Sequence, residues 1–162
     1  MTETSTSVRV SVVVAAPPEE AFKVFTEDMA SWWAPDHHLM QAPLASMVLE
    51  PKVGGSVYDV GTDGSECRWG TVLAYDPPER VAFSWNISLQ WQLETDPSRV
   101  SEVEVRFVPE GEDATRVELE HRHLDRHGEG WEGMREAVGS SGGWIVGLER
   151  LARRLAGEPV DG

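Results

Sequence analysis

Residues 101–123, SEVEVRFVPEGEDATRVELEHRH, contain two stretches of alternating apolar and polar side chains, joined by Gly111-Glu112-Asp113. A period of two is typical of strands with one buried face, and glycine beside acidic residues is typical of a turn. The segment therefore predicts a long hairpin with strands at Ser101–Val108 and Thr115–His123. Four side chains of the second strand share the parity of its apolar face: Val117, Leu119, His121 and His123.

The chain before this hairpin carries similar signals for further short strands. Residues 8–14 alternate valine with other side chains until Pro17-Pro18, and two short helices follow, ending near Trp33. Proline cannot continue a ladder but suits the first turn of a helix. Turn-forming residues separate the remaining strands, which we expect at 47–50, 56–60, 68–75 and 81–89. Six or seven strands in this order predict one antiparallel meander.

The apolar spacing after Gly128 becomes helical. Residues 139–143 interrupt it, which leaves two alternatives: the helix begins at about Gly142, or a short helix at 130–138 precedes it. We favour the second, because adjacent glycines are poor in a helix interior. A sheet with one apolar face must be covered. The sequence therefore predicts an α+β helix-grip fold, in which a curved antiparallel sheet of six to seven strands wraps around a long C-terminal helix.

Charge and composition restrict the classes of function. The 162 residues include 14 Lys and Arg and 28 Asp and Glu, a formal charge of −14. Such a charge repels phosphate backbones and anionic lipids, so we expect no nucleic-acid and no membrane partner. Cys67 is the only cysteine, and no segment is typical of a signal peptide or a membrane span. We expect a cytoplasmic protein with one domain at 8–156, between flexible ends at 1–7 and 157–162.

Motifs along the whole chain resemble those of a known superfamily. They are Val14–Phe22, Glu50–Gly55, Asp63-Gly64, Trp69–Val72, Asp76–Arg80, Phe83–Trp85, Ser101–Phe107, Thr115–Arg122 and Gly142–Trp144. In order and spacing they are similar to the SRPBCC (START-like, Bet v 1-like) superfamily, and more narrowly to its AHSA1-like branch, related to the activator of Hsp90 ATPase homologue 1. The resemblance implies a helix-grip fold with a cavity. It implies no single activity, because the superfamily includes lipid carriers, hormone receptors, cyclases, oxygenase domains and cochaperone domains.

Tryptophan is the most unusual component of the chain, with seven residues. An indole offers a large apolar area and one N–H donor, which suits a pocket for a flat or lipophilic ligand. The alternative is that these side chains only form the core. The predicted ligand-binding residues, on the concave face and the covering helix, are Trp33, Trp69, Phe83, Trp85, Trp91, Leu119, His121, His123, Trp144 and Leu148.

Two histidines are the first candidates for chemistry. His121 and His123, two apart on one strand face, can bind a metal, act as acid–base groups or form hydrogen bonds at the cavity rim. Catalytic zinc usually needs a third protein ligand. Asp36 or His37-His38 would have to supply it, and nothing in the sequence places them nearby. We therefore predict no metal and no cofactor.

Two strand carboxylates, Glu50 and Asp59, are further candidates, and their orientation depends on the register. If Val48 and Val57 face inward, both carboxylates enter the cavity, where burial raises a carboxyl pKa. In the opposite register both acids face solvent. The sequence leaves these two alternatives open, and Glu50 joins the two histidines as a weak catalytic candidate.

The predicted function is the binding of a small hydrophobic or aromatic molecule in an internal cavity. One alternative is a cyclase-, hydratase- or hydrolase-like enzyme that uses His121, His123 or Glu50 as general acid or base. Another, suggested by the resemblance, is a stress- or chaperone-related module with an Hsp90-type partner. The cochaperone family has N-terminal sequence that this chain lacks, which counts against that partner without excluding it. A homodimer through sheet edges or through Trp32-Trp33 is a further prediction.

Overall fold

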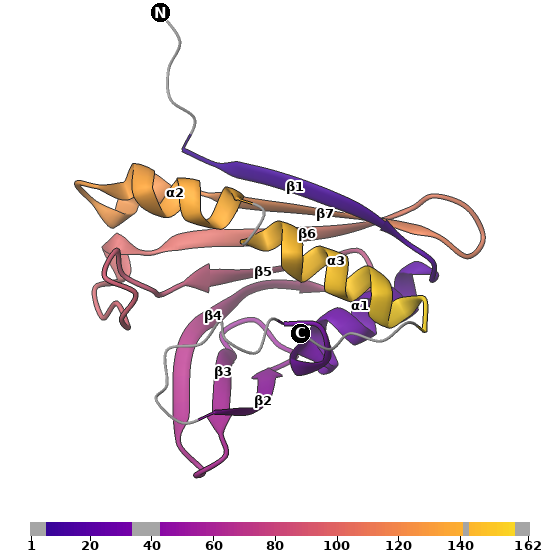
Figure 1. The fold of residues 1–162 in the computed structure, drawn as a ribbon, viewed down its shortest axis with the longest axis horizontal. Helices are drawn as coiled ribbons and strands as arrows, with labels where there is room; N and C mark the ends of the chain where they lie inside the picture. The colour runs from indigo at the N-terminus through magenta and orange to yellow at the C-terminus, as the bar shows by residue number, and fades with distance from the viewer. Residues whose placement is uncertain (1–5, 34–42, 141–142, 158–162) are drawn as a thin grey trace, which may run out of the picture.

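The computed structural model describes residues 6–33, 43–140 and 143–157, which form a seven-stranded sheet and three α-helices (Figure 1). The strands are β1 (Val8–Val14), β2 (Leu44–Leu49), β3 (Ser56–Gly61), β4 (Glu66–Asp76), β5 (Arg80–Trp85), β6 (Ser101–Pro109) and β7 (Thr115–Arg122). The α-helices are α1 (Pro18–Glu27), α2 (Trp131–Gly139) and α3 (Trp144–Leu155), and the short 3-10 helices are η1 (Met29–Ser31), η2 (Pro97–Arg99) and η3 (Leu124–His127). None of the described helices is long and apolar enough to cross a membrane.

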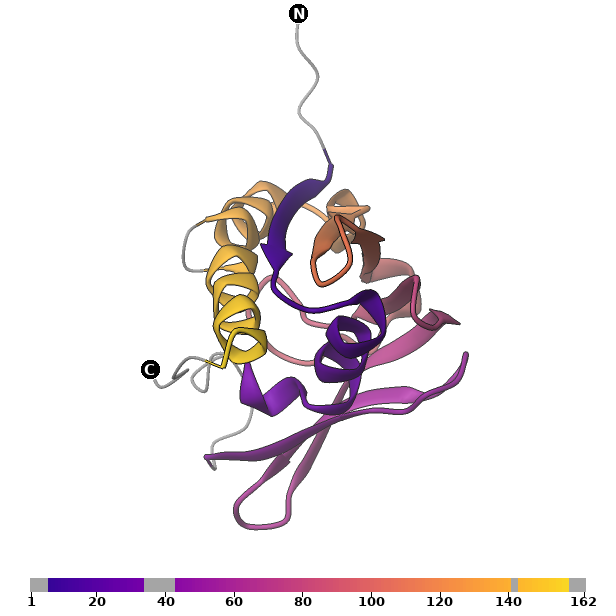
Figure 2. The same cartoon turned by 90° about the vertical axis from the view of Figure 1, so that its right-hand side faces the viewer.

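All neighbouring strands are antiparallel, in the order β1-β7-β6-β5-β4-β3-β2. Strands β2 to β7 pair with their neighbours in sequence, whereas β1 pairs with β7, the last strand, with Val10 opposite Leu119. The sheet curls, and α1 and α3 lie on its concave side (Figure 2). The predicted helix-grip α+β fold is confirmed, with seven strands and two short helices after the first.

Alternation along β7 defines the two faces of the sheet. Val117, Leu119 and His121 are buried, while the charged residues between them remain partly exposed. A strand with one buried face has one register that buries its apolar set. The face with these buried residues is the inner face, and the charged face is the outer face.

Helix α3 covers the inner face. Its residues Trp144, Leu148 and Leu151 are buried. Gly147 lies on the same helix, and a Cβ at this position would lie only 3.4 Å from the indole of Trp32. The helix can therefore approach η1 and its following residues closely. Helix α2 confirms the predicted short helix before α3.

A β-bulge in β4 changes which of its residues face the interior. In the pairing with β3, Arg68 and Gly70 have partners, whereas Trp69 between them has none. Trp69, the unpaired residue of the bulge, and Val72, three positions later, are both buried, so the inward parity changes within one strand. A bulge adds one residue and re-aims the side chains around it. This irregularity lets both side chains join the core.

Three strands end earlier than the sequence predicted, and one of them, β5, ends at Trp85 and not at Leu89. Strand β7 ends at Arg122, and His123 has a φ of 60°, in the left-handed region. The alternation stops there, so the prediction that His123 continues the inner face of the strand is wrong. Strand β2 ends at Leu49, and Glu50 lies in the turn that follows.

Candidate ligand-binding site

Four indoles form a closed cycle inside the fold. The ring centroids of Trp33 and Trp69 are 5.6 Å apart, those of Trp69 and Trp85 5.7 Å, those of Trp85 and Trp144 5.5 Å, and those of Trp144 and Trp33 5.5 Å. The rings meet tilted or edge to face, the arrangements that aromatic quadrupoles favour. We call these four residues the tryptophan quartet. Trp33 follows η1, Trp69 lies in β4, Trp85 in β5, and Trp144 is the first residue of α3. The quartet therefore joins the sheet to α3 and to the segment after η1.

A buried hydrogen-bond network adjoins the quartet. Nε1 of Trp144 donates to Nδ1 of His121 at 3.1 Å. The hydroxyl of Ser101 lies 2.7 Å from Nε2 of His121 and 2.8 Å from Nε2 of His127. Ser101, His121 and His127 are all buried. We call these four residues the buried network; they connect α3, β7, β6 and η3.

Both histidines of the buried network are neutral at about pH 7. Burial, with a smaller contribution from His127, lowers the pKa of His121 to about 3. Burial also lowers the pKa of His127; Glu94 opposes this shift and Arg99 adds to it. Arg99 further donates a 2.9 Å hydrogen bond to the backbone oxygen of His127, which fixes the end of η3.

Two buried ring nitrogens at this end of the inner face have no hydrogen-bond partner in the described part of the chain: Nε1 of Trp85, which carries a proton, and Nδ1 of His127. The rings of Trp85 and His121 lie 5.0 Å apart, and Trp85 is paired with Ser101 across β5 and β6. Leaving a buried donor without an acceptor costs about 1–3 kcal/mol. The site thus presents the indole N–H of Trp85, which a ligand with an acceptor oxygen would satisfy.

The two candidate carboxylates near β2 and β3, Asp59 and Glu50, have different orientations. Asp59 is buried, and its Oδ1 accepts a 2.9 Å hydrogen bond from Nε1 of Trp69. Glu50 instead accepts from the backbone N–H of Ser56 at 2.6 Å, within the turn between the strands. Of the two carboxylates, Asp59 therefore belongs to the site, whereas that of Glu50 is engaged in a turn. Burial and the charge of Asp59 together raise the pKa of Cys67.

Eight of the ten predicted ligand-binding residues are buried in one core: Trp33, Trp69, Phe83, Trp85, Leu119, His121, Trp144 and Leu148. The structure does not bring Trp91 or His123 into this group. Trp91 is 48% exposed in the loop after β5, and His123 lies beyond the end of β7. Their predicted contact with a ligand stays a prediction, as does the role of the eight.

Sequence reasoning missed two members of the site, Ser101 and His127. Ser101 is the first residue of the predicted hairpin, and its parity with Val103 was a usable signal for an inward side chain. His127 carries no comparable signal, because it reaches Ser101 only through the fold of η3. Asp36 and His37-His38 lie outside the described residues. Within the described residues, no group of three or more His, Cys, Asp and Glu side chains is arranged to hold a metal ion.

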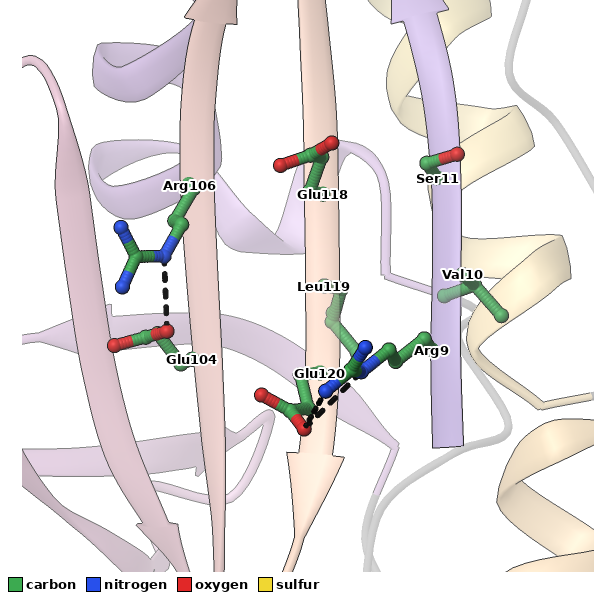
Figure 3. Close-up of a pocket in the computed structure, with 8 residues that line it drawn as sticks. All are labelled: Arg9, Val10, Ser11, Glu104, Arg106, Glu118, Leu119 and Glu120. Atoms are coloured by element: carbon green, nitrogen blue, oxygen red, sulfur yellow. Dashed lines mark hydrogen bonds and ion pairs between the residues drawn. The ribbon is translucent and has the colours of Figure 1, made fainter. Parts of the chain in front are cut away.

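A depression on the outer face of β1, β7 and β6 is lined mainly by charged and polar side chains, unlike the aromatic inner face (Figure 3). Its charged side chains are all engaged in ion pairs, and that of Glu118 is with Arg116, outside the depression. Arg9 contacts Glu120 at 3.2 Å, and Arg106 contacts Glu104 at 3.1 Å, as the dashed lines in Figure 3 show. Charged groups that neutralise one another across strands stabilise a sheet surface. We therefore place the candidate site at the quartet and the buried network.

The chain is similar to several known proteins. The family profile described as "Activator of Hsp90 ATPase homolog 1-like protein" matches residues 15–156. No curated protein matches the chain. Among solved structures, an anthrahydroquino-gamma-pyrone synthase, Txn09, is 45% identical, with a TM-score of 0.65 over 94% of this chain and 99% of that one.

Two further solved structures come from related folds. CalC from Micromonospora echinospora, a self-sacrificing resistance protein, is 30% identical, with a TM-score of 0.67 over 98% of this chain and 99% of that one. DynU16, a putative protein in the dynemicin biosynthetic locus, is 22% identical over 98% of this chain and 51% of that one, with a TM-score of 0.62. The latter likeness shows the fold alone.

Proposed function

The chain belongs to the activator of Hsp90 ATPase homologue 1-like family, and from this premise we propose that it binds a planar polycyclic aromatic molecule with carbonyl oxygens and closes a ring on it. The quartet and its neighbouring N–H groups support the binding. The similarity to a pyrone synthase supports the ring closure. Both parts use the inner face between the sheet and α3.

The observation that carries the proposal is the unpartnered N–H of Trp85 within an aromatic cluster. Flat aromatic rings pack favourably against indoles, and a carbonyl oxygen is the acceptor that an indole N–H lacks here. The hydrogen bond to such an oxygen contributes about 0.5–1.5 kcal/mol. A quinone-like molecule combines both features, whereas a plain hydrocarbon or a saturated lipid has only part of them.

Ring closure is supported by the 45% identity with the pyrone synthase over nearly the full length of both chains. In such a reaction an enol or phenol oxygen attacks a carbonyl carbon of the same molecule. A C–O bond forms, the attacking oxygen loses its proton and the carbonyl oxygen gains one; loss of water then restores conjugation. N–H donors aimed at the carbonyl oxygen stabilise the charge that develops there. The site residues supply such donors.

Binding is tested with anthraquinone and anthracene, which share a ring system and differ in two carbonyl groups. Quenching of tryptophan fluorescence measures both affinities. We expect tighter binding of anthraquinone, and the substitution Trp85→Phe, which keeps one aromatic ring but removes the N–H with the five-membered ring of the indole, should weaken it roughly three- to tenfold. The same substitution should weaken the binding of anthracene less, because anthracene loses only packing area and no hydrogen bond.

The matched control is Trp91→Phe, because Trp91 is exposed and lies outside the quartet. It should bind both compounds like the unmodified protein. Ring closure is tested by mass spectrometry with a hydroxyanthraquinone that carries a β-diketone side chain next to its hydroxyl group; the hydroxyl oxygen attacks the distant ketone, and the cyclised product has lost one water. Failure to bind either ring system would contradict the proposal; binding without turnover would remove its enzymatic part.

An Hsp90-type partner is a second candidate, favoured by the description of the family. A partner-binding module would stimulate the ATPase of the host's Hsp90 homologue at micromolar concentration, and this effect would persist in Trp85→Phe. No stimulation would exclude this function. A homodimer likewise remains a prediction, which the mass of the native protein in solution decides.

A further inference from the structure

The direction of hydrogen-bond donation in the buried network is fixed at Trp144. An indole N–H can only donate, so Nδ1 of His121, at 3.1 Å, must accept. A neutral imidazole has one N–H, and this proton must then lie on Nε2 of His121. A protonated imidazole is excluded at this position, because it would direct a second N–H against that of Trp144.

The same order of donor and acceptor continues from His121 through Ser101 to His127. Nε2–H of His121 donates to the Ser101 hydroxyl oxygen at 2.7 Å. The hydroxyl proton of Ser101 is thereby free to be donated to Nε2 of His127, at 2.8 Å. His127, neutral and accepting at Nε2, must carry its proton on Nδ1. That nitrogen is the one without a partner in the described structure.

The charged groups that face His127 from the surrounding elements do not change which ring nitrogen of His127 accepts the hydrogen bond. Arg99, from η2, donates to its backbone oxygen and does not compete for the ring. Glu94, from the loop after β5, and Arg99 act on the ring with opposite sign. Among the described residues, the hydrogen bond of the His127 ring is the one with Ser101 on β6. The buried network therefore favours the tautomer of His127 that accepts the Ser101 proton at Nε2.

We propose that Trp144, His121 and Ser101 hold His127 as its Nδ1–H tautomer, and that this N–H donates a hydrogen bond to a carbonyl oxygen of the bound aromatic molecule. The second clause rests on the proposed function; the first does not. His127 is then a contact residue for the ligand, and Ser101 is a positioning residue. Trp85 and His127 form a pair of donors at one end of the inner face.

The same direction limits the chemistry of His127. If His127 gave its proton away, the proton of Ser101 could move to Nε2 of His127 and that of His121 to Ser101. His121 would then have to take the indole proton of Trp144 to stay neutral, and an indole does not release its proton near neutral pH. The buried network thus cannot supply His127 with a new proton. His127 stabilises a developing oxyanion by hydrogen bonding, while the proton that the carbonyl oxygen gains comes from the attacking oxygen or from water.

Long-range proton–nitrogen NMR of the imidazole rings at about pH 7 tests the first clause in the absence of any ligand. We expect His121 as the Nε2–H tautomer and His127 as the Nδ1–H tautomer. In Ser101→Ala, His127 should shift toward Nε2–H, which neutral histidine otherwise prefers. Ser98→Ala, in the exposed η2, is the matched control and should change nothing.

An Nε2–H signal for His127 in the unmodified protein would overturn the proposal. An unchanged tautomer in a folded Ser101→Ala variant would overturn the role of Ser101. If that variant does not fold, as judged by circular dichroism, the tautomers of the unmodified protein decide alone.

Addition of anthraquinone tests the second clause. The Hδ1 resonance of His127 should move downfield with anthraquinone and stay in place with anthracene. Anthraquinone that quenches tryptophan fluorescence but leaves this resonance unmoved would overturn the ligand contact. Absence of any binding would contradict the proposed function and with it the ligand contact, while the tautomer measurement would still decide the first clause.

Discussion

Nε1 of Trp144 donates a hydrogen bond to Nδ1 of His121 across 3.1 Å, and this bond ties the first residue of α3 to the inner face of β7. Trp144 belongs to both the tryptophan quartet and the buried network. One side chain thus couples the aromatic surface to the orientation of both imidazoles. Packing of the covering helix and the chemistry of the site are therefore linked.

The first prediction concerns the dependence of stability on pH. The pKa of His121 is lowered from 6.5 to about 3 in the folded protein. The unfolded chain binds a proton there as the pH falls below 6.5, and the folded chain does not. The contribution of His121 is therefore fully present above pH 6.5 and decreases, by up to about 1.4 kcal/mol per pH unit, as the pH falls toward 3.

The variant His121→Gln isolates this contribution, because glutamine can accept from Trp144 and donate to Ser101 but does not titrate. Urea unfolding between pH 4 and 7 should give a shallower loss of stability for the variant than for the unmodified protein. His127 titrates in both, so its effect cancels. Parallel curves would show that His121 is protonated equally in the folded and unfolded states.

The second prediction concerns the thiol of Cys67. Burial raises its pKa, and the carboxylate of Asp59 adds to this shift. Asp59→Asn removes the charge and keeps an oxygen that accepts from Trp69. The pH midpoint of iodoacetamide alkylation, followed by mass spectrometry, should fall in the variant and still exceed that of an exposed cysteine, because burial is the larger cause.

Glu66→Gln provides the control for this experiment. Glu66 is the sequence neighbour of Cys67, but it is exposed and paired with Arg68. Its removal should leave the alkylation midpoint in place. An Asp59→Asn midpoint equal to that of the unmodified protein would mean that Asp59 carries no charge beside the thiol.

Local pattern was sufficient to predict the sheet and much of the site. Leu119 and His121 were assigned to the inner face from strand alternation, because a slip of one residue would expose the whole apolar set. Trp144 was assigned to the covering helix from the change of period. In both cases the information lies within a few residues of the side chain itself.

The rest of the site depends on contacts between distant segments. His127 reaches Ser101 across 26 positions, after the chain leaves β7 through the left-handed His123. Alternation cannot predict a residue beyond the point where the strand ends. Trp69 likewise faces inward together with Val72 only because a bulge separates them. The pairing with β3 creates that bulge, and no local signal in β4 requires it.

The third prediction concerns Glu104, on the outer face beside the depression of Figure 3. Its side chain is 7% exposed and contacts Arg80 at 2.8 Å, Arg106 at 3.1 Å and Arg122 at 3.4 Å. Burial alone would raise the pKa of Glu104, but these three arginines outweigh it and lower the pKa. Glu104→Gln should destabilise the protein by about 1–3 kcal/mol at neutral pH, because three cations lose their common carboxylate.

Chemical denaturation of this variant has a direct comparison in Glu66→Gln, whose exposed ion pair with Arg68 contributes less than about 1 kcal/mol. The pKa of Glu104 is lowered, so its contribution is present above its ordinary value of 4.5 and is lost as the pH falls through the folded-state pKa. The difference in the free energy of unfolding between Glu104→Gln and the unmodified protein should therefore become smaller at acidic pH. Equal effects of the two variants would contradict a special role for the buried carboxylate.

The fourth prediction concerns Gly70, next to the bulge that turns Trp69 inward. A Cβ at this position would lie 2.7 Å from the backbone oxygen of Ser84 and 3.3 Å from Cβ of Val57. Neither atom belongs to a flexible side-chain end, so β4 must move away from β5. Gly70→Ala should therefore destabilise the protein by about 1–3 kcal/mol and weaken the near-ultraviolet circular dichroism of the quartet.

Gly133→Ala is the matched substitution, because Gly133 lies in α2 and a Cβ there meets nothing within 4 Å. Alanine favours a helix over glycine, so this variant should be as stable as the unmodified protein or more stable by up to about 1 kcal/mol. Both variants gain one methyl group and lose the same backbone freedom in the unfolded state. A large loss in Gly70→Ala alone then measures the close approach of β4 to β5; equal stabilities would show that β4 can shift without moving Trp69.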